Sequence, residues 1–383
     1  MSIFLLMKPI YRCLLFLALL FTLPPGIKLY SQEGQVKDPG AVENIKIGLL
    51  YSGSGFISSV QAAELAIRRA NQEGEMNGRS FELVKRSTAG PWGVGSKQSV
   101  NLIFQDEVCA ILGSVDARNA HLAEQVAVKA QIVFLSSRAT DPTLSQAFVP
   151  WYFRCIPNDD QQANALLRVI SMKKDSRFVL IGDGGYDAGM AIEAAIRQTR
   201  KAGKPDPKVY TYDSADPDYG FVEQIHANGI RNLVLTGMVS SDLKLLEQLG
   251  MILEERVIFC TLPFIAGMDI EKLVKAFPEG TVLIYPPFNL TPGGPAFEKE
   301  FYENYDSRPD ATAAYIYDGM TLLIEAIRNT GPEPEKIREF LVHADFQDGV
   351  TGSIRFDEMG NRTNAAGLMT IRNGQLVEFE KNE

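Results

Sequence analysis

Residues 108–140 constrain the fold more than any other part of this 383-residue chain. They read as an apolar strand (108–113), an amphipathic helix and a second apolar strand (132–135). This order predicts a βαβ unit with two parallel strands. Open parallel sheets hold small ligands beyond the carboxyl ends of their strands. The polar loop 136–140 follows the second strand and is therefore predicted to lie at such a crevice.

Strand-like runs and helical patterns alternate along the chain in two successive series. The runs are almost continuously apolar, which is typical of parallel strands buried on both faces. Two such series predict two α/β lobes of similar architecture, each built on a doubly wound parallel sheet. The strands are expected at 45–51, 81–86, 108–113 and 132–135 in the first series, and at 178–182, 209–212, 233–236, 257–260 and 282–285 in the second.

The C-terminal part of the chain departs from this alternation. A long helical pattern covers residues 311–328. Two short strand-like runs, 352–357 and 368–371, lie farther along, with a turn sequence at Gly360-Asn361 between them. We expect these two runs to form a closing hairpin.

The N-terminal segment has the pattern of an export signal. Lys8 and Arg12 precede an apolar run at 13–23, and two prolines follow it. The run is short for a bilayer span, which needs about 20 residues, but suits the hydrophobic region of a secretory signal. We expect residues 1–31 to be a signal peptide, residues 32–44 a linker, and the protein to be periplasmic. An uncleaved membrane anchor is the alternative.

Composition excludes several functional classes. The net charge is −9, and removal of residues 1–31, with three basic residues and no acids, would bring it to about −12. This charge disfavours nucleic acids and anionic membranes as partners. The three histidines are scattered, and the glycine-rich loops lack the GxGxxG spacing of dinucleotide sites. We therefore expect no enzymatic activity, no cofactor and no metal site.

Three cysteines, Cys109, Cys155 and Cys260, follow the predicted signal, and each lies in a strand-like apolar run. They are expected to be buried small side chains. A single disulfide remains open as an alternative.

Several stretches between residues 45 and 379 occur in a characteristic order. They are 45–50, 63–71, Asn77-Gly78-Arg79, the loop 136–140, Phe153-Arg154, 314–319 and 348–357. Taken in this order, they resemble the periplasmic branched-chain amino-acid (Leu/Ile/Val) binding protein family of ABC transporters. The resemblance covers nearly all of the chain beyond the linker.

The resemblance implies the type I periplasmic-binding-protein fold, in which three crossover segments join two lobes. The crossovers would lie near Pro157, Pro286-Pro287 and Gly349. Lobe 1 would comprise residues 45–157 with 287–348, and lobe 2 residues 158–286 with 349–383.

The implied function is that of an extracytoplasmic solute-binding protein of an ABC importer. Its ligand would be a branched-chain or other apolar amino acid, or a similar small carboxylate, held between lobes that close on it. A monomer that docks on the permease and ATPase subunits of a transporter is expected. A ligand-sensing module for a signalling receptor is the alternative.

Three residues match binding positions of the family. Thr140 matches a position that binds the amino-acid head group, Asp159 a carboxylate that receives the ligand's ammonium group, and Tyr186 a tyrosine that closes over the ligand. The structural alternatives are a turn or helix cap for Thr140 and a helix cap for Asp159.

Where the family usually has a pair of serines, this chain has Asp116-Ala117, although the backbone amides at a helix start can still bind an anion. Arg118 and Arg138 replace small residues, with Ala139 beside the second. The two guanidinium groups could bind a further carboxylate in bidentate fashion. The alternative is that Arg118 is exposed and Arg138 pairs with Asp116 or Asp159.

The far wall of the pocket is expected to be apolar. The segment 262–265, which contains Phe264, lacks the acid that the family often places there, and Met238 follows the neighbouring strand. Trp92 lies in a glycine-rich loop, either as a lid over the ligand or in simple packing. Such a wall suits an aliphatic or aromatic ligand group.

Overall fold

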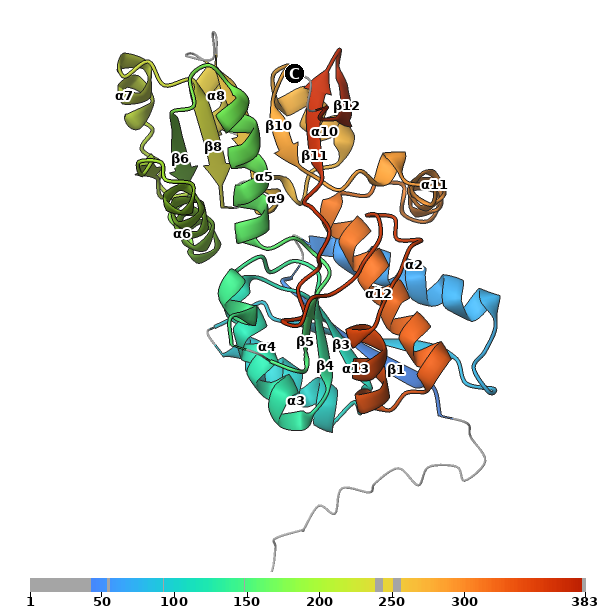
Figure 1. Cartoon of the computed structure of the whole chain (residues 1–383). Coiled ribbons are helices and arrows are strands. Elements are labelled where there is room, and N and C mark those ends of the chain that lie inside the picture. The colour runs from blue at the N-terminus through green and yellow to red at the C-terminus, as the bar shows by residue number, and fades with distance from the viewer. Residues whose placement is uncertain are drawn as a thin grey trace, which may run out of the picture. The chain divides into compact units, whose positions relative to one another are not determined.

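The computed structural model describes residues 43–53, 56–91, 93–147, 149–237, 244–250 and 256–380. The predicted signal peptide therefore lies outside the described residues. Figure 1 shows two separate β-sheets with helices around them. No helix in the described part of the chain is long and apolar enough to cross a membrane.

The first sheet has five parallel strands in the order β2-β1-β3-β4-β5. This order places β1 and β3 side by side, with the chain winding outward in both directions, which is the doubly wound arrangement. The strands are β1 (Ile45–Tyr51), β2 (Phe81–Ser87), β3 (Ala110–Ser114), β4 (Val133–Ser136) and β5 (Tyr152–Arg154).

The second sheet has seven strands in the order β12-β11-β10-β9-β8-β6-β7. The strands from β10 to β7 are parallel, whereas β11 and β12 are antiparallel additions at one edge. They are β6 (Phe178–Gly182), β7 (Lys208–Thr211), β8 (Asn232–Thr236), β9 (Val257–Cys260), β10 (Val282–Ile284), β11 (Leu368–Arg372) and β12 (Gln375–Glu378).

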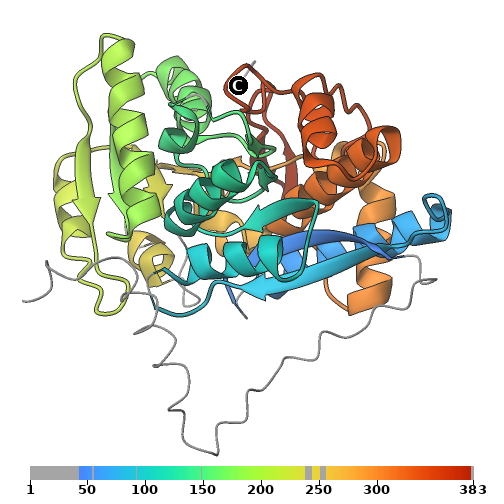
Figure 2. The same ribbon diagram turned by 90° about the horizontal axis from the view of Figure 1, so that it is seen from below.

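Helices cover both faces of the first sheet (Figures 1 and 2). One face packs against α2 (Ile57–Glu73), α12 (Ala311–Thr330) and α13 (Pro334–Val342), and the other against α3 (Val94–Phe104) and α4 (Ala117–Ala130). We call this sheet with its helices lobe 1.

The second sheet with its own helices is called lobe 2. Here α5 (Asp159–Met172) packs against α6 (Tyr186–Lys201). Its other described helices are α7 (Phe221–Ala227), α8 (Lys244–Gly250), α9 (Leu262–Ile265) and α10 (Ile270–Ala276). In lobe 1, the 3₁₀ turn η2 (Pro142–Ser145) packs against α4, and α11 (Gly294–Tyr305) packs against α2 and the 3₁₀ turn η3 (Phe288–Leu290).

Polar caps fix the starts of two helices, α4 in lobe 1 and α5 in lobe 2. Asp116 accepts a hydrogen bond from the Asn119 amide at the start of α4, and Asn158 forms a reciprocal capping box with Gln161 at the start of α5. Such caps satisfy backbone N–H groups that have no partner within the helix. The cap residues therefore determine where each helix begins relative to the preceding strand.

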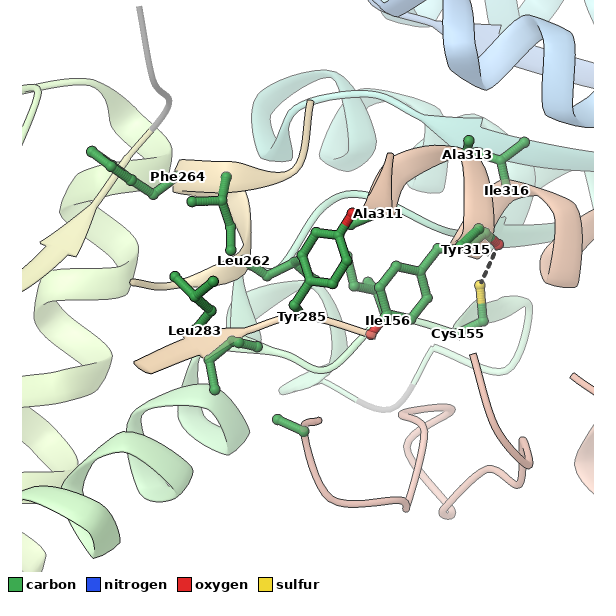
Figure 3. Packing of buried hydrophobic residues seen from close by; sticks show 14 of the residues in the cluster. Cys155, Ile156, Leu262, Phe264, Leu283, Tyr285, Ala311, Ala313, Tyr315 and Ile316 are labelled. Atoms are coloured by element: carbon green, nitrogen blue, oxygen red, sulfur yellow. Dashed lines mark hydrogen bonds between the residues drawn. The ribbon is translucent and has the colours of Figure 1, made fainter. Parts of the chain in front are cut away.

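A continuous apolar core runs from one sheet to the other. The same cluster contains Leu49 of β1, Leu180 of β6 and Leu323 of α12. Part of it, around Tyr285 and Tyr315, is drawn in Figure 3. The predicted fold class, two doubly wound α/β lobes, is confirmed, and the three described cysteines are free thiols.

The predicted closing hairpin is wrong in its pairing. The runs 352–357 and 368–371 do not pair; β11 pairs instead with β12, across a turn at Asn373-Gly374 with φ values of 50° and 69°. Ile354 and Phe356 form only isolated bridges. Asn-Gly is the preferred sequence of a two-residue hairpin turn, because both residues must adopt positive φ.

Buried polar contacts hold together the segments near the predicted crossovers. Asp318 of α12 accepts hydrogen bonds from the amides of Val350 and Thr351, each at 2.7 Å. Arg362 donates to the carbonyl oxygen atoms of Cys155 and Thr351. The exact lobe boundaries given above stay a prediction.

Candidate functional site

A narrow cavity lies where the carboxyl ends of strands from both sheets approach each other. The loop after β4 contributes one side of it, and the first turns of α6 and α9 contribute the other. It has room for about one water molecule. The lining residues are Ser137, Arg138, Thr140, Ile156, Asp187, Leu262, Pro263, Ala266, Thr312 and Tyr315.

Much of the cavity wall is apolar. Leu262 is fully buried and Ile156 nearly so, and both belong to the core cluster that joins the lobes. Figure 3 labels both side chains together with Tyr315, whose backbone carbonyl accepts a weak hydrogen bond from the Cys155 thiol. Any ligand that enlarged this cavity would contact aliphatic and aromatic surface on several sides.

Arg138 brings a positive charge to the cavity. Its guanidinium carbon lies 3.9 Å from the centre of the Phe56 ring, and Nη1 donates to Ser52 Oγ at 3.2 Å. Stacking covers one face of the guanidinium, so the in-plane N–H groups are the ones suited to bidentate binding of a carboxylate. Burial lowers the pKa of Arg138, and Asp187 is the charged group that opposes this effect most. Arginine stays protonated in proteins, so the cavity keeps its positive charge.

Asp187 brings a negative charge to the same cavity from lobe 2. Its Oδ1 accepts a hydrogen bond of 3.2 Å from the backbone N–H of Ala117, the first residue of α4 in lobe 1. A helix N-terminus favours an anion at this place. Burial raises the pKa of Asp187, whereas the nearby charge of Arg138 lowers it.

Further contacts between the lobes form a rim outside the cavity. The Tyr186 hydroxyl donates to Asp141 Oδ2 at 3.2 Å, and the Arg118 guanidinium lies 5.0 Å from the centre of the Tyr186 ring. Asp141 also lies 3.1 Å from His121 Nε2. Hydrogen bonds to Asp141 and Glu124 raise the pKa of His121 to about 9, so its imidazole is charged at neutral pH.

Asp159 is buried with little hydrogen-bond compensation. It is 2% exposed, and neither carboxylate oxygen accepts a hydrogen bond from the described residues. Burial raises its pKa to about 7, although the nearby Thr140 hydroxyl offsets part of this effect. The side chain lines an apolar pocket within lobe 2, beside Thr236 and Thr261, and does not line the cavity between the lobes.

The structure brings part of the predicted site together. Arg138 and Thr140 line the cavity, whereas Ala117, Arg118 and Tyr186 lie at its rim. Asp116, predicted beside them, serves as the cap of α4.

Other predicted residues lie elsewhere. Ala139 and Phe264 are 3% exposed and pack into the cores of lobes 1 and 2, respectively, so neither side chain faces the cavity. Trp92 and Met238 lie outside the described residues.

Sequence reasoning missed Asp187 and several apolar lining residues. The Gly-rich loop before α6 had drawn attention to Tyr186, and Asp187 follows it directly. Because Tyr186 begins a helix, the next side chain points about 100° away around the helix axis, here toward the cavity. Tyr315 could be placed only once α12 was packed against lobe 1.

The donor set of this site suits binding more than chemistry. It offers a guanidinium group, a carboxylate, hydroxyl groups and apolar surface. Among the described residues, no group of three or more His, Cys, Asp or Glu side chains is placed to hold a metal ion.

Comparison with known proteins agrees with this geometry. Residues 44–375 match the model of a family described as periplasmic binding protein. A leucine-, isoleucine-, valine-, threonine- and alanine-binding protein of Pseudomonas aeruginosa is 22% identical over 340 residues, which cover 85% of this chain and 88% of the relative.

Two solved structures share the fold. The branched-chain amino-acid-transporter substrate-binding protein LivJ of Streptococcus pneumoniae, in complex with isoleucine, has a TM-score of 0.73 and 21% identity, covering 87% of this chain and 97% of its own. A solute-binding protein of an ABC transporter from R. palustris, in complex with benzoate, has a TM-score of 0.73 and 17% identity, covering 88% and 95%.

Proposed function

The chain belongs to the periplasmic binding protein family, and from this membership we propose that it is the extracytoplasmic solute-binding component of an ABC importer. Family and fold are those of solute-binding proteins, not of enzymes. The proposed ligand is an apolar amino acid or a similar small carboxylate, held between the two lobes. Delivery to a membrane permease with its ATPase subunits is part of the same proposal.

One observation carries this proposal. The cavity between the lobes combines the Arg138 guanidinium with a largely apolar wall. A carboxylate that bears an aliphatic or aromatic group matches both features, because arginine binds carboxylates in bidentate fashion and the wall shields apolar surface from water. The isoleucine and benzoate bound by the two similar structures both fit this description.

Within this proposal, Thr140 and Arg138 contact the ligand's head group. Arg118 and Tyr186 act at the rim, where they cover the ligand when the lobes approach each other. Asp159, beside Thr140, is the proposed partner of a ligand ammonium group. A buried carboxylate without hydrogen bonds is costly, which is typical of a site that a ligand completes.

Contacts of one ligand with both lobes would also favour closure of the lobes around it. A ligand that touches both lobes stabilises the arrangement in which they are close, by the difference between its affinities for the closed and open arrangements. A difference of a few kcal/mol is enough to invert such an equilibrium. The closed arrangement would then present one surface to the permease.

The first test is a thermal-shift screen of the purified protein against the twenty amino acids, benzoate and short aliphatic carboxylates. Ligand at about 100 times its dissociation constant adds about 2.7 kcal/mol to the free energy of unfolding, which raises the melting temperature measurably. Arg138→Met should lose this shift, because it removes the carboxylate partner and keeps the side-chain volume. Arg177→Met, at an exposed arginine remote from the cavity, is the matched control and should keep it. A screen without any hit would contradict the proposal.

A second test addresses transport. Deletion of the gene in its host should abolish uptake of the ligand found by the screen, measured with labelled compound, and the Arg138→Met gene should fail to restore it. Uptake at the wild-type rate in the deletion strain would contradict the importer role and leave only the proposal of solute binding.

A further inference from the structure

A second and much larger cavity, of about 640 Å³, lies among the chain segments that run from one lobe to the other. These segments join β5 to α5, β10 to η3 and α13 to β11. Each contributes to the wall: Pro157 comes from the first, Pro287 from the second, and Thr351 and Asn364 from the third. We call this space the junction cavity. Its volume is within the range of small-molecule sites.

The third of these segments is fixed to both lobes. The backbone N–H of Arg154, in β5, donates to the Gly360 carbonyl at 2.8 Å, and that of Tyr285, after β10, donates to the Gly367 carbonyl at 3.1 Å. Figure 1 shows this stretch, in red, leading up to β11. A rotation of one lobe against the other is absorbed by such connecting residues. The shape of the junction cavity therefore depends on how the lobes are arranged.

One side of the junction cavity combines a positive charge with apolar surface. Arg168 and Met172 both line it from α5, and their spacing of four residues places them on the same face of the helix. The Arg168 guanidinium makes no hydrogen bond or ion pair with the described residues. Met172 is 54% exposed, and Leu368 and Phe379 add further apolar lining.

The second guanidinium in the lining, that of Arg362, is already occupied. Its terminal nitrogens donate to the carbonyl oxygen atoms of Cys155 and Thr351, and the Thr351 hydroxyl connects it to Asp318, which offsets part of its charge. Among the described lining residues, Glu378 is the one acid. Two guanidinium groups against one carboxylate favour an anion, and the unpaired one is the group suited to contact it.

We propose that the junction cavity is a second ligand site, which takes a small amphipathic anion. The acidic group of this ligand binds Arg168, and its aromatic or aliphatic part packs against Met172, Leu368 and Phe379. The bound anion stabilises the arrangement in which the lobes touch. Binding at this site does not depend on the proposed function, whereas regulation of solute binding from it rests on that function.

The link to lobe closure follows from the state in which the cavity has its present shape. In this state the Tyr186 hydroxyl reaches Asp141, and Asp187 reaches the Ala117 amide, across the two lobes. A ligand that fits the cavity binds this arrangement more tightly than one with the lobes apart, and so shifts the equilibrium toward it. Tyr315 also lines both cavities. Ligands in the two cavities should therefore strengthen each other's binding, because such coupling is reciprocal.

The experiment uses two dyes with the same aromatic frame. 8-Anilinonaphthalene-1-sulfonate is an anion, and N-phenyl-1-naphthylamine is its neutral analogue without the sulfonate; both fluoresce more strongly in apolar surroundings. Fluorescence titration of the wild-type protein should show a single site that binds the anion at least about 10-fold more tightly, because a charge-assisted hydrogen bond contributes a factor of about 10 to 100. Equal affinities would overturn the assignment of an anion.

Variants of exposed residues locate the dye. Arg168→Met should weaken binding of the sulfonate by about 10-fold or more and leave the neutral dye within about twofold. Lys174→Met, at an exposed lysine just after α5 and outside the lining, is the matched control and should change neither. Ala365→Trp, at an exposed lining residue, should weaken both dyes because it fills the cavity. Undiminished binding in both Arg168→Met and Ala365→Trp would overturn the site.

Two further measurements complete the test. Hydrogen–deuterium exchange of the wild-type protein with the sulfonate dye should slow at the starts of α4 and α6 and stay unchanged in α3, which packs within lobe 1. Unchanged exchange at α4 and α6 with dye bound would overturn the link to closure.

The Arg138→Met variant separates this site from the narrow cavity. It should bind the sulfonate dye as the wild type does. Loss of dye binding in this variant would place the dye between the lobes, which would overturn the inference and leave the proposed function standing. A thermal-shift screen without hits, with dye binding as expected, would contradict only the proposed function.

Discussion

At the scale of single residues, the buried carboxylate of Asp159 destabilises the unliganded protein. Burial in an apolar pocket destabilises this charged carboxylate more than the nearby Thr140 hydroxyl stabilises it, which raises the pKa of Asp159 to about 7. Since the folded state binds the proton more tightly than the unfolded chain does, stability falls as the pH rises from about 4 to about 7 and is then constant. The cost is thus fully present above pH 7.

Asp159→Asn removes this dependence on pH. The free energy of unfolding of the variant, relative to the wild type, should rise between pH 5 and pH 8 by roughly 2 to 4 kcal/mol. Urea denaturation at the two pH values, without ligand, measures it. Asp160→Asn is the control, because Asp160 already pairs with Arg197 at 2.8 Å and its loss should give no gain at pH 8. A constant difference across the pH range would show that Asp159 is not buried as a costly acid.

Single residues of the site also show which positions sequence patterns can predict and which they cannot. Arg138 and Thr140 could be placed at the cavity because they directly follow a strand of a parallel sheet, and strand ends meet at one edge. Ala139, between them, points into the core instead. Asp187 could not be found, because its role depends on the distance between two lobes that sequence patterns do not encode.

At the scale of elements, apolar runs located most strands because parallel strands buried on both faces have a simple signature. The expected runs 45–51, 178–182 and 257–260 coincide with β1, β6 and β9. The pairing predicted for the C-terminal hairpin was wrong because β12 is short and partly exposed, and its apolar pattern is weak. The Asn373-Gly374 turn was the better signal for it.

Gly360 permits a close approach between two segments near the lobe junction. It has a φ of +76°, and a Cβ atom there would lie 2.2 Å from the backbone oxygen of Tyr152 in β5. Gly360→Ala should therefore destabilise the protein by roughly 2 kcal/mol or more, since it combines backbone strain with a clash that a backbone atom cannot relieve.

Gly374→Ala is the matched control for this prediction. Its φ is +69°, but a Cβ atom there would meet nothing within 4 Å. It should cost only the strain, about 1 kcal/mol. Thermal denaturation of both variants measures the difference, and equal melting temperatures would show that the Tyr152 contact does not constrain the junction.

At the scale of the whole molecule, two cavities could hold the ligand. The narrow cavity between the lobes is the proposed site, yet a larger cavity exists beside the predicted crossover segments, lined among others by Pro157, Pro287 and Arg362. Tyr315 lines both. A ligand in the larger cavity would contact the junction and not the ends of α4 and α6.

Hydrogen–deuterium exchange with and without the ligand found by the screen distinguishes these positions most directly. If the ligand binds between the lobes, exchange should slow in both lobes at once, at residues 136–140 and the start of α4 in lobe 1 and at the starts of α6 and α9 in lobe 2. Protection should disappear in Arg138→Met. Protection confined to one lobe, or to residues 351–368 around the larger cavity, would contradict binding between the lobes.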